Sequence, residues 1–432
     1  MSKILKNIFF LRKDFILKSV QAYFIFGLNA FVPLAIIPLI VPSVGINTWG
    51  MIAGVSAIGT YISIIIEGGA HLFGTREIAE NRDNTSHSLN FFCVVFVLRL
   101  ILSLVCGILF FLFILFFHNS FYPLDLFVPA LIWGISLGLT PAWYFLGKQQ
   151  ILLAGICDVI PKILALSICA LVINEPKDAH FYFEILAFSH VLSLFLSYFY
   201  IFMNSEVSNF YRDFKWGPYV RLSLNKARGI YFIHVFGSLY NIFPVIIIGE
   251  FFSLKAAGVY AIGDRVVRTV FNAIQPLRQV IFPKVISFIK DPNSLVPKFV
   301  GNSTIFLIVM SFLVMMLLIF FSGAINRIVF GVVGEGEIKY VIKILSVQMF
   351  IQSIFNALGI NYLLPAHKDK FFFFSVLMSC SVVLVGYFVS VRPPIATTAA
   401  FLILIADSVG LICVVFFTFG ADIKRRMFKH GK

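Results

Sequence analysis

The sequence has little charge for its length. Only 12% of its 432 residues are Asp, Glu, Lys or Arg, whereas about 25% is usual in a soluble globular chain. Hydrophobic residues make up 60% of the chain, and Phe alone contributes 52 residues. A soluble fold of this size could not bury so much apolar surface, because much of any folded surface stays in contact with water. The composition therefore excludes a soluble enzyme, a secreted disulfide scaffold and a disordered chain, and it indicates a polytopic membrane protein.

Motifs of soluble catalysis and of metal binding are also missing. The six cysteines lie in apolar runs and form no CxxC pair, so we interpret them as small hydrophobic residues. The chain contains no phosphate-binding P-loop and no HExxH or DxD motif, and its eight histidines show no ligand spacing. We therefore expect no ATP-hydrolysing motor, no enzymatic activity, no metal and no cofactor. The sequence leaves open whether the protein is coupled to protons, sodium ions or the membrane potential.

Apolar runs long enough to cross a bilayer recur along the chain. A membrane-spanning helix needs about 20 apolar residues, and such runs predict twelve spans. They are Ile16–Val41, Trp49–Ile66, Phe91–Phe117, Leu126–Leu146, Ile151–Ile173, Phe181–Met203, Gly229–Gly249, Ala256–Phe282, Phe299–Phe321, Val341–Leu364, Phe371–Val391 and Ala396–Phe419. The sequence thus predicts an all-α fold with a six-helix bundle in residues 1–203, a cytoplasmic linker at 204–228, and a second six-helix bundle with a basic tail in residues 229–432.

Lys and Arg are concentrated at alternate connections between the spans. They cluster before the first span, in the even-numbered connections and after the last span, and they are rare in the odd-numbered connections. Because basic loops stay on the cytoplasmic side, this pattern predicts that both termini are cytoplasmic. It also accounts for the net charge of +14 without a nucleic-acid partner. The same rule favours a membrane-crossing eighth span, since otherwise the basic cluster at 424–429 would face outward.

The eighth predicted span carries an unusual polar stripe. At 100° per residue, seven polar or charged residues fall within one arc of about 140°, opposite an apolar face. They are Asp264, Arg265, Arg268, Asn272, Gln275, Arg278 and Gln279. A cationic stripe of this kind fits a hydrated cavity for an anionic substrate such as a phosphate or diphosphate. The alternative is an amphipathic helix that lies on the cytoplasmic leaflet.

Other ionisable residues lie within predicted spans, where they are costly unless they face protein or water. Asp158 and Lys162 are one turn apart in the fifth span and can neutralise each other. Asp407 has no partner on its own helix, so it is a candidate for ion coupling or for pairing with an Arg across the bundle. Arg99 in the third span is expected either to reach the membrane surface or to face the lumen.

Two local sequences carry a family resemblance. Residues 66–79 read Ile-Glu-Gly-Gly-Ala-His-Leu-Phe-Gly-Thr-Arg-Glu-Ile-Ala, and residues 141–148 read Pro-Ala-Trp-Tyr-Phe-Leu-Gly-Lys. Together with the prolines of the first span and Gly258-Val259-Tyr260, they make the chain resemble the O-antigen and polysaccharide flippases of the Wzx type. That family belongs to the superfamily that also holds lipid II flippases and multidrug (MATE) exporters.

The resemblance implies a V-shaped pair of six-helix bundles around a cavity that opens alternately to each side of the bacterial inner membrane. The implied substrate is an oligosaccharide repeat unit on undecaprenyl diphosphate, moved from the cytoplasmic to the outer face. The implied partners are this lipid-linked oligosaccharide, membrane lipids, and the polymerase and chain-length regulator of the same pathway. Arg265, Arg268 and Arg278 would then bind the diphosphate, with Arg99 a further cavity candidate. Asn272, Gln275 and Gln279 would suit sugar hydroxyls, and Asp264, Asp407, Asp158 and Lys162 are candidates for coupling or gating.

Two other functions compete with this interpretation. An O-antigen polymerase or ligase would also be a many-spanning membrane protein, but it should carry a sizeable external loop with Arg or His, and the predicted external loops are short. A multidrug exporter of the same superfamily would favour an acidic lumen for cationic drugs, whereas the stripe of the eighth span is basic. Transport of a diphosphate lipid should depend on Arg268, while drug efflux should not.

Overall fold

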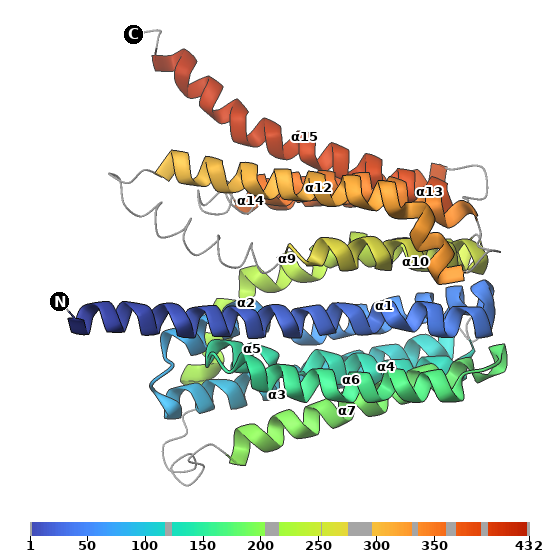
Figure 1. Ribbon diagram of the computed structural model, residues 1–432, viewed down its shortest axis with the longest axis horizontal. Coiled ribbons are helices and arrows are strands. Elements are labelled where there is room, and N and C mark those ends of the chain that lie inside the picture. The colour runs from blue at the N-terminus through green and yellow to red at the C-terminus, as the bar shows by residue number, and fades with distance from the viewer. Residues whose placement is uncertain are drawn as a thin grey trace. The chain divides into compact units, whose positions relative to one another are not determined.

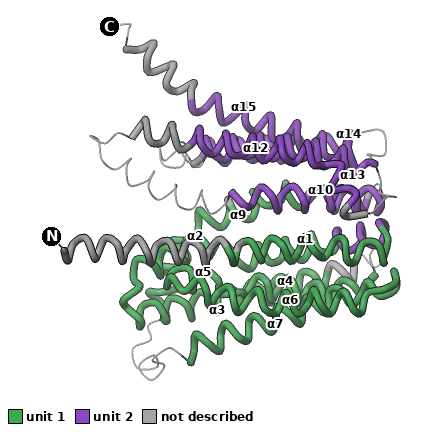
Figure 2. Tube along the Cα trace, in the orientation of Figure 1, with its two compact units in different colours: residues 1–45, 54–242 green, residues 46–53, 243–432 purple. Residues whose placement is uncertain are grey.

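The computed structural model describes residues 2–116, 123–203, 216–251, 253–274, 296–330, 336–359, 369–389 and 396–429. These residues fold into helices and contain no strand, as Figure 1 shows. The chain forms two compact units (Figure 2). The first comprises residues 1–45 and 54–242, and the second comprises residues 46–53 and 243–432. The all-α fold predicted from the sequence is therefore confirmed.

The first unit contains the helices of the N-terminal half. They are α1 (Ser2–Glu67), α2 (Ala70–Glu80), α3 (Thr85–Phe116), α4 (Leu124–Leu139), α5 (Ala142–Gly147), α6 (Ile151–Val172), the 3-10 turn η1 (Pro176–Asp178), α7 (Ala179–Met203) and most of α9 (Trp216–Phe251). Helix α7 packs against both α4 and α6, and α2 packs against α5. The predicted linker at 204–228 is helical from Trp216 onward, because Pro218 stands in the first turn, where it is tolerated, and no breaker follows before Arg228.

The second unit is built from five further helices and the end of α9. They are α10 (Leu254–Asn272), α12 (Val296–Phe330), α13 (Gly336–Leu358), α14 (Asp369–Val389) and α15 (Ala396–Lys429). Helix α13 packs against α10, α12 and α15, and α14 packs against α15. Residues 46–53, in the middle of α1, also belong to this unit, where Gly50 and Gly258 allow α1 and α10 to approach closely.

The described residues include ten helical stretches long and apolar enough to cross a membrane. The first two predicted spans appear as one stretch, because α1 continues through the bend at Gly45 (φ 81°, ψ 163°) instead of ending in a loop. Helix α10 is not among the ten, since its polar face lowers its hydropathy. The predicted count of twelve is compatible with these findings, and the division into two six-helix bundles remains a prediction.

The surface and the core of each unit suit a lipid environment. Large apolar side chains such as Phe111, Phe195, Phe320 and Phe416 are exposed on α3, α7, α12 and α15, as expected for helices that face hydrocarbon. In the first unit, an aromatic core near the ends of α3 and α5 centres on Phe91, Phe92 and Trp143, whose rings contact one another. This core holds α2 and α5 together and positions the polar groups described next.

Candidate functional site

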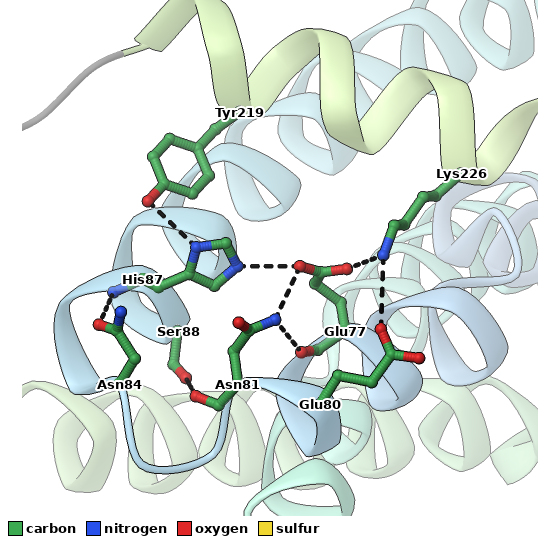
Figure 3. A network of polar contacts seen from close by, with 8 residues as sticks. All are labelled: Glu77, Glu80, Asn81, Asn84, His87, Ser88, Tyr219 and Lys226. Atoms are coloured by element: carbon green, nitrogen blue, oxygen red, sulfur yellow. Dashed lines mark hydrogen bonds and ion pairs between the residues drawn. The ribbon is translucent and has the colours of Figure 1, made fainter.

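A buried carboxylate network ties three helices of the first unit together (Figure 3). Glu77 on α2 has a side chain that is only 4% exposed. Its Oε1 accepts a hydrogen bond from Asn81 Nδ2 (3.0 Å) and lies 2.9 Å from His87 Nε2 at the start of α3. Its Oε2 forms an ion pair with the Lys226 ammonium of α9. The negative charge of Glu77 is thus matched by a cation from a segment 149 residues away.

Further contacts in Figure 3 hold this network in place. The Tyr219 hydroxyl on α9 lies 3.3 Å from His87 Nδ1, so His87 bridges Glu77 and α9. Asn84 Oδ1 accepts the His87 amide at 2.9 Å and caps the first turn of α3. The Ser88 hydroxyl donates to the Asn81 carbonyl at 3.1 Å. We call this group, Glu77, Asn81, His87, Tyr219 and Lys226, the Glu77 network.

Lys148, which follows α5, contacts the turn between α2 and α3, next to the Glu77 network. Its Nζ donates a 2.6 Å hydrogen bond to the Arg82 carbonyl in the turn between α2 and α3. Burial lowers the pKa of Lys148, and the nearby charge of Arg82 lowers it further, while Asp83 opposes the shift. The side chain therefore serves as a fixed donor that joins α5 to the α2–α3 turn.

A second carboxylate cluster lies ten residues earlier in the chain. Glu67, the last residue of α1, has Oε1 at 2.7 Å from His71 Nδ1 on α2 and Oε2 at 2.9 Å from His234 Nε2 on α9. The two imidazole rings are 4.9 Å apart, centroid to centroid. The side chains are 21%, 45% and 24% exposed in the order Glu67, His71, His234. We call these three residues the Glu67 cluster.

Two glycines create the turn on which the Glu67 cluster depends. Gly68 (φ 61°) and Gly69 (φ 77°) both have left-handed backbone conformations, which glycine adopts at little cost. They end α1 and start α2 at a new angle, so that the His71 amide donates to Glu67 Oε1 at 2.9 Å. A Cβ at Gly69 would lie 2.7 Å from Cγ2 of Ile230. Helix α9 therefore packs directly against the glycine turn and carries His234 to the carboxylate.

Arg99 donates hydrogen bonds to backbone carbonyls of a neighbouring helix. The residue is buried, and its Nη2 donates to the carbonyls of Gly138 and Thr140 at the C-terminal end of α4. The Tyr198 hydroxyl of α7 donates to the Leu139 carbonyl beside them at 2.9 Å. Because α4 ends before Pro141, these carbonyls lack helical partners. Arg99 thus supplies hydrogen bonds to carbonyl groups at a helix end inside the bundle.

Asp158 and Lys162 lie together on α6, as their spacing allows. Lys162 Nζ donates to Asp158 Oδ2 at 2.6 Å and to Asn29 Oδ1 at 2.9 Å. Asn29 belongs to α1, so this pair joins two membrane helices of the first unit. Both charged side chains are about one-fifth exposed (23% and 21%).

The polar stripe of α10 is only partly within the described residues. Asp264 and Arg268 form an ion pair in which Arg268 Nε lies 2.7 Å from both carboxylate oxygens. Arg265 is half-buried next to them, and Asn272 is exposed at the end of the helix. Gln275, Arg278 and Gln279 lie outside the described residues. The described part of the stripe therefore brings one acidic and two basic side chains together on α10.

Asp407 has a partner from another helix of the second unit. Gln348 on α13 donates its Nε2 hydrogen bond to Asp407 Oδ2 on α15, and both side chains are buried. The sequence left open whether Asp407 would pair across the bundle with an Arg. Gln348 brings a neutral amide to it from 59 residues away.

Sequence reasoning did not assign roles to the Glu67 cluster or the Glu77 network. Glu67 and Glu77 stand within the stretch 66–79 that carries the family resemblance, and His234 lies on a polar face of the seventh predicted span. However, Glu67 and His234 are 167 residues apart, and no local pattern joins them. The expectation that the histidines have no ligand spacing holds along the chain, but the fold brings two of them to one carboxylate.

Comparison with known proteins identifies the family. A family described as "Polysaccharide biosynthesis protein" matches residues 16–290, well over half of the chain. The chain belongs to this family. A putative O-antigen transporter of Escherichia coli K12 is 21% identical over 356 residues, which cover 80% of this chain and 82% of the relative. The resemblance to polysaccharide flippases that the sequence predicted is therefore confirmed.

Solved structures show the fold of this polysaccharide biosynthesis protein. The lipid II flippase MurJ in an inward closed conformation matches with a TM-score of 0.65 and 12% identity, over 93% of this chain and 87% of that one. An inward-facing MATE-family multidrug resistance transporter of the MOP superfamily matches with a TM-score of 0.57 and 12% identity, over 93% of this chain and 99% of that one. The family member described here therefore has the fold of a MOP-superfamily membrane transporter.

Proposed function

We propose that this protein is a flippase that moves an undecaprenyl-diphosphate-linked oligosaccharide from the cytoplasmic to the outer face of the bacterial inner membrane. The observation that carries the proposal is the family match over residues 16–290 together with an O-antigen transporter relative that aligns with four-fifths of the chain. Both termini would lie in the cytoplasm, as the distribution of Lys and Arg predicts.

The physical task explains why such a substrate needs a protein. Each sugar hydroxyl that enters hydrocarbon without a hydrogen-bond partner costs several kcal/mol, and the diphosphate is charged as well. A transporter must therefore supply polar and cationic groups within the membrane while the lipid tail stays in the bilayer. Such groups are expensive inside a span, and they are expected only where they face protein or water.

Helix α10 supplies the cationic groups that a diphosphate requires. Arg265 and Arg268 would bind the phosphate oxygens through charge-assisted hydrogen bonds, and Asp264, which holds Arg268 Nε, would orient that guanidinium. Arg278 would extend the stripe, and Asn272, Gln275 and Gln279 would bind sugar hydroxyls. Arg99 does not enter the proposal, because its Nη2 is committed to the carbonyls at the end of α4.

The coupling of transport to an ion gradient requires a carboxylate whose partners can change. Asp264 and Asp407 are the candidates in the second unit, and the Asp158–Lys162 pair with Asn29 is the candidate in the first. In each case a proton or cation that neutralises the carboxylate would weaken a contact between or within helices. Replacement of each carboxylate by its amide should separate these candidates by the pH or sodium dependence of flipping.

The first experiment tests which step of the pathway is lost. The gene is deleted in its native host, and undecaprenyl-linked saccharides are profiled together with the surface polysaccharide. The proposal expects complete repeat units to accumulate on undecaprenyl diphosphate, with no polymer at the surface. Single repeat units that are exported and attached to surface lipid would instead indicate a polymerase, and an unchanged profile would favour drug or ion efflux.

The second experiment tests the stripe of α10. A double variant, Asp264→Asn with Arg268→Gln, removes the cation without leaving an unpaired carboxylate, and Arg265→Gln removes the neighbouring cation. Loss of charge-assisted hydrogen bonds to a diphosphate should lower flipping by about tenfold or more in each variant. Lys177→Gln, at an exposed ion pair with Glu175 in η1, is the control and should transport normally. Full activity of both stripe variants would contradict this assignment of the substrate site.

A further inference from the structure

We propose that the Glu67 cluster is a binding site for one divalent transition-metal ion, with Zn²⁺ as the best match. Glu67, His71 and His234 each offer one ligand atom, and these three atoms lie within 4.8 Å of one another. The site would join the end of α1, the start of α2 and the middle of α9. It lies entirely within the first unit and is independent of the flippase activity proposed above.

The donor atoms suit zinc in kind and number. Two imidazole nitrogens and one carboxylate oxygen form a borderline donor set that zinc binds well. Three protein ligands with a fourth position for water are typical of open zinc sites. His71 is nearly half exposed (45%) and the other two side chains are about one-fifth to one-quarter exposed, so the cluster is not sealed inside the first unit.

The distances between the ligand atoms require a local rearrangement of the side chains. Bonds of about 2.0–2.1 Å from zinc to each ligand place neighbouring tetrahedral ligands about 3.3 Å apart. The structure has 2.7 Å between Glu67 and His71 and 2.9 Å between Glu67 and His234. These two contacts use different oxygens of Glu67, and the three ligand atoms lie within 4.8 Å of one another. Around one ion the short contacts would widen by about half an ångström, and the most separated ligand atoms would approach by up to about 1.5 Å through side-chain rotation. The ion would replace the protons that now bridge the carboxylate and the imidazoles.

The backbone around the cluster is organised to hold it. The left-handed turn at Gly68 and Gly69 fixes the direction of Glu67, whose Oε1 also accepts the His71 amide. Ile230, one turn before His234, packs on Gly69 and sets the height of α9 against the turn. Such outer contacts orient the ligands of metal sites and raise their affinity.

The Glu77 network contains similar side chains but does not form a metal site. It also combines a carboxylate with a histidine, but the Lys226 ammonium already pairs with Glu77 Oε2. A cation at that position neutralises the carboxylate and repels a metal ion. Among the described residues, the Glu67 cluster is the group of histidine and acidic side chains that can converge on one ion.

The test uses the full-length protein, purified in detergent with an affinity tag that contains no histidine. Zn²⁺ is titrated against a chromophoric chelator, and thermal unfolding is followed with Zn²⁺ and with EDTA. We expect binding of one ion per chain and a Tm that rises with Zn²⁺ and returns with EDTA, since a ligand that binds only the folded state stabilises it. His71→Ala and Glu67→Gln should each weaken binding at least tenfold.

His180→Ala is the matched control, because this histidine lies next to η1, its Nδ1 is 2.9 Å from the Lys177 carbonyl oxygen, and it belongs to no cluster of potential metal ligands among the described residues. It should bind zinc as the parent protein does. If the variant of the third ligand, His234→Ala, is too unstable to purify, the exposed His71→Ala variant still tests the proposal. The visible spectrum of bound Co²⁺ provides a second measurement. No stoichiometric binding by the parent protein, or unchanged binding by His71→Ala and Glu67→Gln, would overturn the proposal. Flipping assays play no part in these outcomes, so failure here leaves the proposed transport function untouched.

Discussion

The Glu67 cluster and the Glu77 network are ten residues apart, and they use the same kinds of side chain to different ends. Each holds a carboxylate between α2 and α9 with at least one histidine. The Glu77 side chain is 4% exposed and pairs with an ammonium, whereas the Glu67 side chain is 21% exposed and pairs with two imidazoles. A buried carboxylate with a permanent cation is a fixed structural tie. A partly exposed carboxylate between imidazoles can exchange its partners for a proton or a metal ion.

One helix supplies both sets of partners. Lys226 and His234 are eight residues apart on α9, or about 12 Å along its axis. Helix α9 is therefore attached to α2 at two heights, once by a strong ion pair and once by a cluster that responds to ligands. The comparison leads to four predictions, which begin with the change of largest expected effect.

Glu77→Ala should be the most destabilising of these changes. It leaves His87 without its carboxylate and Lys226 with the more distant Glu80 Oε2, at 3.8 Å. Removal of one partner from a largely buried pair costs several kcal/mol. Because Lys226 is one-third exposed (34%), we expect a loss of about 2–3 kcal/mol in the free energy of unfolding. Reversible unfolding in mixed micelles measures this quantity. The control is Glu80→Ala, one turn away and half exposed (49%), which should cost about 1 kcal/mol or less; equal losses would contradict the distinction.

Gly69→Ala should cause the next largest loss of stability. An alanine in a left-handed conformation costs about 1–2 kcal/mol, and its Cβ would lie 2.7 Å from Ile230 Cγ2. Gly45→Ala is the control for backbone strain without a contact to α9, since Gly45 also has a positive φ (81°) but no atom within 4 Å of the added Cβ. Because its ψ is 163°, a region nearly restricted to glycine, Gly45→Ala should itself lose at least as much stability as Gly69→Ala. Both variants should lower stability, and only Gly69→Ala should also weaken zinc binding. The same loss of zinc affinity in both variants would show that the contact with α9 is unimportant.

Glu67→Gln should change stability little. The partly exposed carboxylate contributes about 1 kcal/mol or less through its imidazole contacts, and a glutamine oxygen can still accept the His71 amide. Glu77→Gln, the same chemical change in the buried network, should cost clearly more. The free energies of unfolding of Glu67→Gln and Glu77→Gln, measured under the same conditions, give this difference directly. A larger effect at Glu67 than at Glu77 would reverse the interpretation of the two carboxylates.

Tyr219→Phe should have the smallest effect. It removes the hydroxyl that lies 3.3 Å from His87 Nδ1, and loss of one such hydrogen bond costs about 0.5–1 kcal/mol. The ring would keep its packing against His87, whose centroid is 5.3 Å away. Tyr219→Ala, which also removes the ring, should cost more, and equal losses would assign the effect to the hydroxyl alone.

Local patterns predicted some contacts of the site but not others. The spacing of Asp158 and Lys162 was sufficient to suggest their pair, because both stand on one helix face one turn apart. It did not indicate Asn29, which reaches Lys162 from α1, 133 residues away. Arg99 was recognised as an unusual charge, but its position on the end of α4 depends on how α3 packs against α4.

The sequence by itself determined that this protein is an all-α membrane protein, because hydropathy and helical periodicity are local properties that do not depend on the packing. The stretches 66–79 and 141–148 carried the resemblance to the family, which the match over residues 16–290 confirmed. Only the tertiary structure decided which charges meet. Helix α9 places Lys226 on Glu77 and His234 on Glu67 across 149 and 167 residues, and Gln348 reaches Asp407 from another helix. The physical reason is that these ionisable side chains find their partners on neighbouring helices, and no spacing within one helix encodes that choice.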